Sequence, residues 1–180
     1  MIIDNIILKK EGKIDMLYPN EYFKSVTQIS YDYLISKNIK ALILDVDNTL
    51  IDYNKNLSSE IIKWAEELKE KNIKLYILSN SNKREKVKNV AKKLDIDYMF
   101  FGMKPLKRGF KKIHKKLNIN NENIAVVGDQ IFTDVLGANR MKMYSILVEP
   151  IMEKDILITL LKRPIENFIK ERYLKQRRKN

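Results

Sequence analysis

From residue 40 onward, short apolar runs alternate with amphipathic stretches, and this rhythm restricts the possible fold more than any other feature of the sequence. Each run is almost continuously hydrophobic, as expected of a parallel strand that is buried on both faces. The five runs span residues 40–45, 74–79, 98–101, 124–129 and 144–148. Between them, apolar residues recur at helical spacing. The pattern predicts a three-layer α/β fold, with a doubly wound (Rossmann-like) parallel sheet of about five strands.

The composition is that of an ordinary globular chain. A hydrophobic fraction of 44%, with 5 Gly and 4 Pro, excludes collagen-like and low-complexity sequences. The length of 180 residues predicts a single domain over residues 1–180, with a core at about 17–173 and a basic tail at about 174–180. The chain has no Cys, which excludes disulfides, zinc thiolates and a catalytic thiol.

The formal net charge of +12 indicates an anionic partner, although a lysine-rich composition accounts for part of the excess. The candidates are nucleic acid, an anionic membrane surface and phosphorylated substrates. No basic motif interleaved with aromatic residues is present, so nucleic acid is not expected. No run approaches the roughly 20 apolar residues that span a bilayer, and the N-terminus lacks a signal peptide's basic leader. We expect a cytoplasmic protein, or one held peripherally at the inner face of the membrane; the oligomeric state stays open.

Polar side chains follow the predicted strands at the points where they end. Asp45 and Asp47 come after the first strand, Ser79 after the second, and Asp129 after the fourth, while Lys104 follows the third by a few residues. Ligands of such sheets bind outside the carboxyl ends of the strands. These side chains are therefore predicted to converge in one crevice.

Closely spaced Asp residues without His or Cys suit a hard cation such as Mg²⁺, which also relieves their mutual repulsion. In such a site one carboxylate can attack phosphorus, and a second can protonate the leaving oxygen and later activate water. Lys104 would direct a positive charge toward the phosphate, and Ser79 and the backbone N–H groups near Asn80 would donate hydrogen bonds. The alternative for Asp45 and Asp47 is a solvated turn after a strand.

Four segments resemble, in order, the motifs of the haloacid dehalogenase (HAD) superfamily. They are "DVDNT" (45–49), "ILSNS" (77–81), "KP" (104–105) and "GDQIFTD" (128–134). The resemblance implies that Asp45 is the nucleophile and that Asp47 is the general acid/base and gives a backbone carbonyl to the metal. It further implies that Ser79 and Lys104 hold the phosphate, and that Asp129, with Asp134 near it, completes the Mg²⁺ site.

Two of the remaining assignments, those of Asn80 and Asp134, have simpler alternatives. We assign Thr49 and Asn80 to phosphate binding as well, although Asn80 could instead shape the turn after its strand. Asp134 is assigned to the metal, directly or through its hydrogen bonds, but it could merely be the acidic residue at the start of its helix.

The longer matches, among them "NIKALILDVDNTL" and "GDQIFTDVLGANRMKMYSILVEP", resemble the YqeG-type subgroup of the subclass IIIA phosphatases. This subgroup is related to mitochondrial phosphatases of phosphatidylglycerophosphate, which implies a phospholipid head group as substrate. About thirty residues separate Asp47 from Ser79 and about twenty-five separate Ser79 from Lys104, too few for a large cap domain. The alternatives are a phosphatase of a soluble sugar phosphate, nucleotide or phosphoprotein, and a non-catalytic scaffold on the same fold.

The C-terminal segment 160–180 is basic, and its apolar residues Ile165, Phe168, Ile169 and Tyr173 recur at helical spacing. One interpretation is a terminal helix that docks on the sheet and is followed by a basic tail. The other is a helix that lies on anionic lipid.

Overall fold

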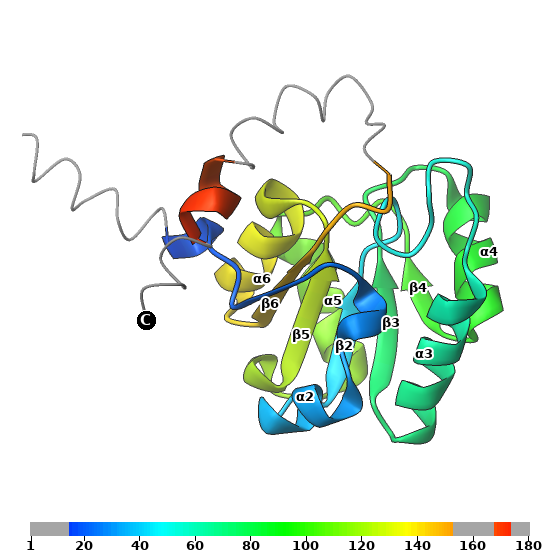
Figure 1. The fold of residues 1–180 in the computed structure, drawn as a ribbon, viewed down its shortest axis with the longest axis horizontal. Helices are drawn as coiled ribbons and strands as arrows, with labels where there is room; N and C mark the ends of the chain where they lie inside the picture. The colour runs from blue at the N-terminus through cyan, green and yellow to red at the C-terminus, as the bar shows by residue number, and fades with distance from the viewer. Residues whose placement is uncertain (1–14, 153–167, 174–180) are drawn as a thin grey trace, which may run out of the picture.

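The computed structural model describes residues 15–152 and 168–173, and it confirms the α/β fold with one strand more than expected (Figure 1). Six parallel strands form one sheet in the order β1-β6-β5-β2-β3-β4. The strands are β1 (Glu21–Phe23), β2 (Ala41–Leu44), β3 (Lys74–Leu78), β4 (Asp97–Met99), β5 (Ile124–Gly128) and β6 (Tyr144–Val148). The helices are α2 (Tyr31–Ser36), α3 (Ser59–Glu70), α4 (Arg84–Leu94), α5 (Lys107–Leu117) and α6 (Leu136–Met141).

Short helical turns complete the described chain. Three of them are 3₁₀ turns, η1 (Asp15–Leu17), η2 (Val26–Gln28) and η3 (Asn121–Asn123), whereas η4 (Ile131–Val135) is a π-helical turn that leads directly into α6. None of the helices in the described residues is long and apolar enough to cross a membrane.

Side chains alternate across the sheet and divide the core into two layers. Leu42 and Leu44 of β2 pack with the apolar residues of α2, α3 and α4, whereas Ala41 and Ile43 pack with those of α5 and α6. Both faces of the central strands are therefore covered, as their continuous hydrophobicity predicts.

The chain order creates a switch point beside β2. From β2 the chain proceeds outward to β3 and β4, then returns across the sheet to β5 on the other side of β2. Loops that leave β2 and β5 therefore diverge, and a crevice opens between them at the carboxyl ends of the strands. The residues that follow these two strands face this crevice.

The additional strand β1 was not expected from the sequence. It is three residues long and pairs with β6 at the edge of the sheet, with Glu21 opposite Ile146 and Phe23 opposite Val148. Asn20 anchors it, because its backbone N–H donates to the carbonyl of Ser145 and its side chain accepts from the Ser145 N–H. A three-residue strand is too short to show a periodic pattern.

Asn82 with Glu85 three residues later matches a capping box, which predicts that α4 begins after Asn82, but the observed start differs. The helix begins at Arg84, its N-cap is Lys83, and no side chain caps it. By contrast, Ser58 caps α3 by accepting a hydrogen bond from the Ile61 N–H.

The C-terminal helical turn at 168–173 packs against η4 and lies beside η1 at the start of the described chain (Figure 1). Ile169 is buried with Ile131, Val135 and Leu147, whereas Phe168 is exposed. This turn is thus docked on the protein, in agreement with the first interpretation of the segment. Ile165 and the basic tail 174–180 lie outside the described residues.

Candidate active site

Asp45 lies immediately after β2 and is buried. Its backbone N–H donates to the carbonyl of Val127 on β5 at 2.9 Å, so the hydrogen bonding between β2 and β5 continues as far as Asp45. The position of its carboxylate is therefore fixed by the two central strands of the sheet.

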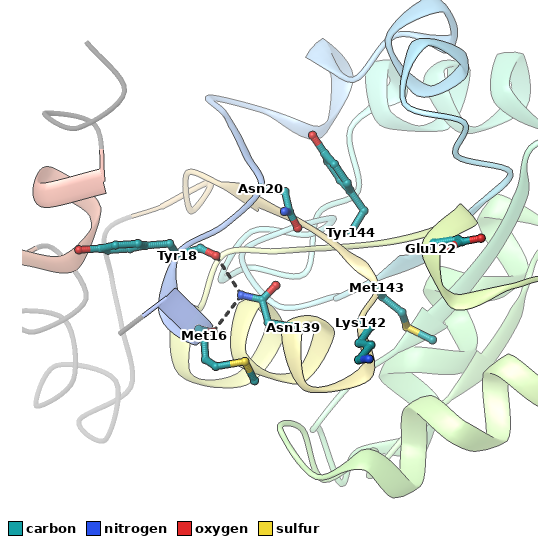
Figure 2. Close-up of a pocket in the computed structure, with 8 residues that line it drawn as sticks. All are labelled: Met16, Tyr18, Asn20, Glu122, Asn139, Lys142, Met143 and Tyr144. Carbon is teal, nitrogen blue, oxygen red and sulfur yellow. Dashed lines mark hydrogen bonds between the residues drawn. The ribbon is translucent and has the colours of Figure 1, made fainter. Parts of the chain in front are cut away.

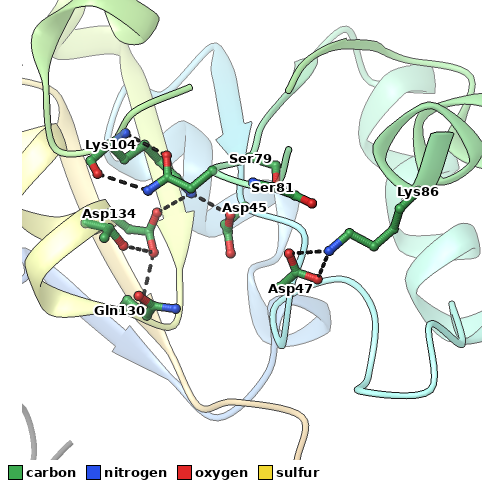
Figure 3. A network of polar contacts seen from close by, with 10 residues as sticks. Asp45, Asp47, Ser79, Ser81, Lys86, Lys104, Gln130 and Asp134 are labelled. Atoms are coloured by element: carbon green, nitrogen blue, oxygen red, sulfur yellow. Dashed lines mark hydrogen bonds and ion pairs between the residues drawn. The ribbon is translucent and has the colours of Figure 1, made fainter. Parts of the chain in front are cut away.

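The carboxylate of Asp45 shares a buried lysine with Asp134 (Figure 3). Lys104 Nζ lies 2.5 Å from Asp45 Oδ1 and 2.6 Å from Asp134 Oδ1, and all three side chains are less than 10% exposed. Burial raises the pKa of Asp45 to about 7; the ammonium of Lys104 opposes this shift, and the carboxylate of Asp134 adds to it. For Lys104, burial alone would lower the pKa, but Asp134 and Asp45 raise it above its usual range, so the lysine stays charged.

A third carboxylate joins this cluster. Asp45, Asp129 and Asp134 each present an oxygen within 4.8 Å of the others, and all three residues are buried. When all three carboxyl groups are ionised, the cluster has two more negative charges than the ammonium compensates, and a divalent cation would balance them. An all-oxygen set suits Mg²⁺, so the residues present fit the ion that the sequence predicts.

Glycine at position 128 is needed for this arrangement. A Cβ at Gly128 would lie 2.3 Å from the carboxyl carbon of Asp134, a separation that real structures do not tolerate. The Asp134 carboxylate also accepts hydrogen bonds from the Gln130 N–H and the Thr133 hydroxyl, both at 3.2 Å. It is thus held by its own loop as well as by Lys104.

The end of β3 forms the next part of the site. Ser79 is fully buried, and its hydroxyl accepts the N–H of Ser81 at 3.1 Å. Both polar atoms of the Asn80 amide bind the Lys104 backbone: Nδ2 donates to its carbonyl at 3.0 Å, and Oδ1 accepts its N–H at 2.6 Å. Asn80 therefore positions Lys104, a role that the sequence did not suggest.

Thr49 lies in the loop after β2 and is 2% exposed. Its hydroxyl has no hydrogen-bond partner in the part of the chain that the structure describes. A buried hydroxyl without a partner costs free energy unless something binds it. The expectation that Thr49 contacts a phosphate is therefore consistent with its surroundings.

Asp47 is placed apart from the three buried carboxylates. Its side chain is half exposed and forms two contacts with Lys86 of α4, at 2.5 Å to Oδ1 and 2.6 Å to Oδ2 (Figure 3). The sequence analysis did not identify Lys86. Its only signal was its place in the first turn of the helix that follows Ser79.

A cavity of about 800 Å³ opens beside Asp47. Its wall is formed by the loop after β2 (residues 47–55, here called the flap), by the β3–α4 loop with Lys86, and by Phe101 and Gln130. A loop, α3 and β3 lie between Asp47 and Ser79, and α4 and β4 lie between Ser79 and Lys104, so no large cap domain is inserted in either interval. The absence of a large cap agrees with the expectation from the motif spacing.

A second cavity, of about 430 Å³, lies away from these residues (Figure 2). Its wall includes Glu122, Lys142 and Tyr144, which precede or begin β5 and β6 and so lie at the amino ends of the strands. Within it, the Asn139 amide donates to the carbonyls of Met16 and Tyr18, both at 2.9 Å. This amide holds the N-terminal segment against α6, which is a structural role.

Comparison with known proteins agrees with the motifs. The family model described as mitochondrial PGP phosphatase matches residues 7–152. The chain is 37% identical over 152 residues to a protein of Bacillus subtilis (strain 168) described as "Probable phosphatase YqeG", covering 84% of this chain and 88% of that protein. A crystal structure of an uncharacterized protein from Listeria monocytogenes serotype 4b superimposes with a TM-score of 0.53 at 20% identity. The match covers 66% of this chain and 85% of the Listeria protein, and it supports the fold. The chain therefore belongs to the mitochondrial PGP phosphatase family and is a phosphatase, in agreement with the four HAD-like motifs of its sequence.

Proposed function

We propose that residues 1–180 form one Mg²⁺-dependent phosphomonoesterase domain that works through a phosphorylated Asp45. The observation that supports it most is the placement of the Asp45 carboxylate. It is buried at the switch point of the sheet, 2.5 Å from the ammonium of Lys104 and next to two further acids. A nucleophile in this position can approach phosphorus while fixed positive charge compensates the phosphate.

In the first step, an oxygen of Asp45 forms a bond to phosphorus and the bond from phosphorus to the ester oxygen breaks. Asp47 gives its proton to that leaving oxygen. In the second step, Asp47 removes a proton from water, the water oxygen attacks phosphorus, and the bond to Asp45 breaks. Inorganic phosphate leaves and both carboxyl groups return to their starting states.

The remaining residues orient the phosphoryl group. Lys104 directs its ammonium at the phosphate oxygens, and the hydroxyls of Thr49 and Ser79 donate hydrogen bonds to them. Asn80 contributes through the Lys104 backbone that it binds. Mg²⁺, held by Asp45, Asp129, Asp134 and the backbone carbonyl of Asp47, would supply the positive charge that offsets the developing negative charge.

Phosphatidylglycerophosphate is our preferred substrate. The match to the family of mitochondrial PGP phosphatases supports it, as does a cavity without a large cap, which a head group can enter from a membrane surface. The net charge of +12 would favour a peripheral position on an anionic bilayer at the cytoplasmic face. A soluble sugar phosphate, nucleotide or phosphoprotein is the alternative substrate. The intact set of acids argues against the non-catalytic scaffold.

The test is phosphate release from phosphatidylglycerophosphate in mixed micelles with Mg²⁺, beside soluble sugar phosphates and nucleotides at equal concentration. We expect the lipid to be hydrolysed with the highest kcat/KM, and Asp45→Asn to abolish release from every substrate. Asp95→Asn is the matched control, since Asp95 is exposed and precedes β4, at the amino ends of the strands and not at the carboxyl ends where Asp45 lies. If a sugar phosphate is hydrolysed and the lipid is not, the lipid proposal fails and the phosphatase assignment stands.

A further inference from the structure

The cavity beside Asp47 contains three lysines that the proposed chemistry does not use. Lys55, Lys83 and Lys86 line it, and they come from two separate segments, the flap after β2 and the first turn of α4 with its N-cap. Positive charge from two segments that face one cavity is an arrangement that attracts an anion.

The acids of this cavity only partly balance these lysines. Asp47 is paired with Lys86. Asp52 accepts the backbone N–H of Asn56 at 2.8 Å, which lowers the pKa of Asp52 and keeps it ionised, and its other oxygen accepts the Asn56 amide at 3.0 Å. Within residues 15–152 and 168–173, neither Lys55 nor Lys83 has an ion-pair partner. Two ammonium groups therefore remain available to an incoming ligand.

The cavity is connected to the reaction centre by residues that belong to both. Asn80 lines the cavity and binds the Lys104 backbone, and Gln130 lines the cavity and donates its N–H to Asp134. The cavity therefore adjoins the reaction centre, and it can receive the remaining part of a substrate whose phosphate reaches Asp45. Figure 3 shows Lys86 extending from α4 to Asp47, on the opposite side from Lys104.

We propose that Lys55, Lys83 and Lys86 form a second anion subsite, which binds a further phosphate of the substrate next to the phosphate that is removed. The proposal rests on the proposed phosphatase function and defines its substrate class as esters with two phosphates a few bonds apart. A lipid phosphodiester and a soluble bisphosphate present the same chemistry to the lysines.

The subsite also links recognition to the reaction. Lys86 binds both oxygens of Asp47, so Asp47 cannot approach a leaving oxygen without giving up at least one of these contacts. A second anion at Lys86 competes with Asp47 for the same ammonium and releases its carboxyl group. Binding of the correct substrate therefore frees the acid/base group, whereas a plain monoester leaves it paired.

The experiment compares two water-soluble esters in Mg²⁺. Glycerol 3-phosphate has one phosphate, and the deacylated head group of phosphatidylglycerophosphate has a phosphodiester on the same glycerol. We expect the second compound to have the higher kcat/KM, and Lys86→Met and Lys83→Met each to remove about tenfold of that preference, the loss of one charge-assisted contact. Lys92→Met, an exposed lysine further along α4, is the matched control and should leave the preference unchanged.

The outcomes separate this proposal from the proposed function. Equal kcat/KM for the two esters, or equal losses on both in Lys86→Met and Lys83→Met, overturns the subsite while the phosphatase function stands. A preference for the deacylated compound that the lysine variants lose supports the subsite, even if intact lipid in micelles is not hydrolysed. A soluble bisphosphate such as fructose 1,6-bisphosphate, hydrolysed faster than the deacylated compound, would support the subsite and point to a soluble source.

Discussion

Two lysine–aspartate pairs lie on opposite sides of the crevice, with nearly the same contact distance and very different surroundings. Lys104 and Asp45 are 2.5 Å apart with side chains 2% and 9% exposed, whereas Lys86 and Asp47 are 2.5 Å apart with side chains 14% and 50% exposed. The buried pair is held by Asn80 and Asp134 as well, while both residues of the other pair line the cavity of about 800 Å³.

The two pairs should differ in the free energy that is lost when one partner is removed. A buried charge that loses its partner has neither water nor another group to replace it, so the buried pair is a fixed part of the protein. An exposed pair exchanges its contacts for water or for a ligand at little cost. We infer that the Lys104 side of the crevice holds its geometry through the reaction and that the Lys86 side rearranges.

The largest effect is expected from Lys104→Met, which removes the ammonium and keeps a similar volume. Asp45 and Asp134 then face each other without compensation, and the free energy of unfolding should fall by about 3–5 kcal/mol. Urea denaturation in Mg²⁺-free buffer measures it. Lys115→Met, at an exposed position of α5, is the control. A loss below about 1 kcal/mol would mean that the two pairs do not differ as described.

The next effect concerns Asp47→Asn, which tests the exposed side of the crevice for a chemical role. An amide cannot donate or accept the proton, so steady-state turnover should fall by about 10²–10⁴-fold. With an aryl phosphate, whose leaving group needs no protonation, Asp45 should still become phosphorylated, and the phosphorylated protein should accumulate. Single-turnover measurements with rapid quenching separate the two steps. An equal loss at both steps would contradict the assigned roles.

A smaller effect is expected from Mg²⁺ on the stability of the native protein. An ion that binds only the folded state at 100 times its Kd stabilises it by about 2.7 kcal/mol. For a chain of this size, this corresponds to a rise in Tm of about 5–10 °C. Thermal unfolding followed by circular dichroism, with Mg²⁺ and with EDTA, measures the shift. In Asp129→Asn the shift should shrink; a shift of unchanged size would place the ion elsewhere.

The smallest effect is expected from Lys86→Met on stability. Since Asp47 is half exposed and can be hydrated when it loses its partner, the free energy of unfolding should change by no more than about 1 kcal/mol. Urea denaturation beside Lys104→Met gives the direct comparison. A loss as large as that of Lys104→Met would show that both sides of the crevice are equally fixed.

Most of the central fold could be predicted because strands that are buried on both faces are almost continuously hydrophobic. β2, β3, β5 and β6 fall within the predicted apolar runs, and the acids of the site follow β2 and β5 as expected. The short edge strand β1 has no such hydrophobic run, and its position depends on the contacts of Asn20 with Ser145, 125 positions away. The N-cap of α4 was misplaced because Asn82 and Glu85 mimic a capping box that the preceding turn does not form.

The sequence by itself determined the layer architecture, the strand ends at which chemistry could occur and the family, because each depends on local periodicity or contiguous motifs. Only the tertiary structure decided how the charges are shared. Lys104 between Asp45 and Asp134, Asn80 on the Lys104 backbone, and Lys86 on Asp47 join residues 24 to 59 positions apart. Which lysine meets which carboxylate depends on how loops from different strands converge, and whether the contact is fixed or exchangeable depends on how much water reaches it.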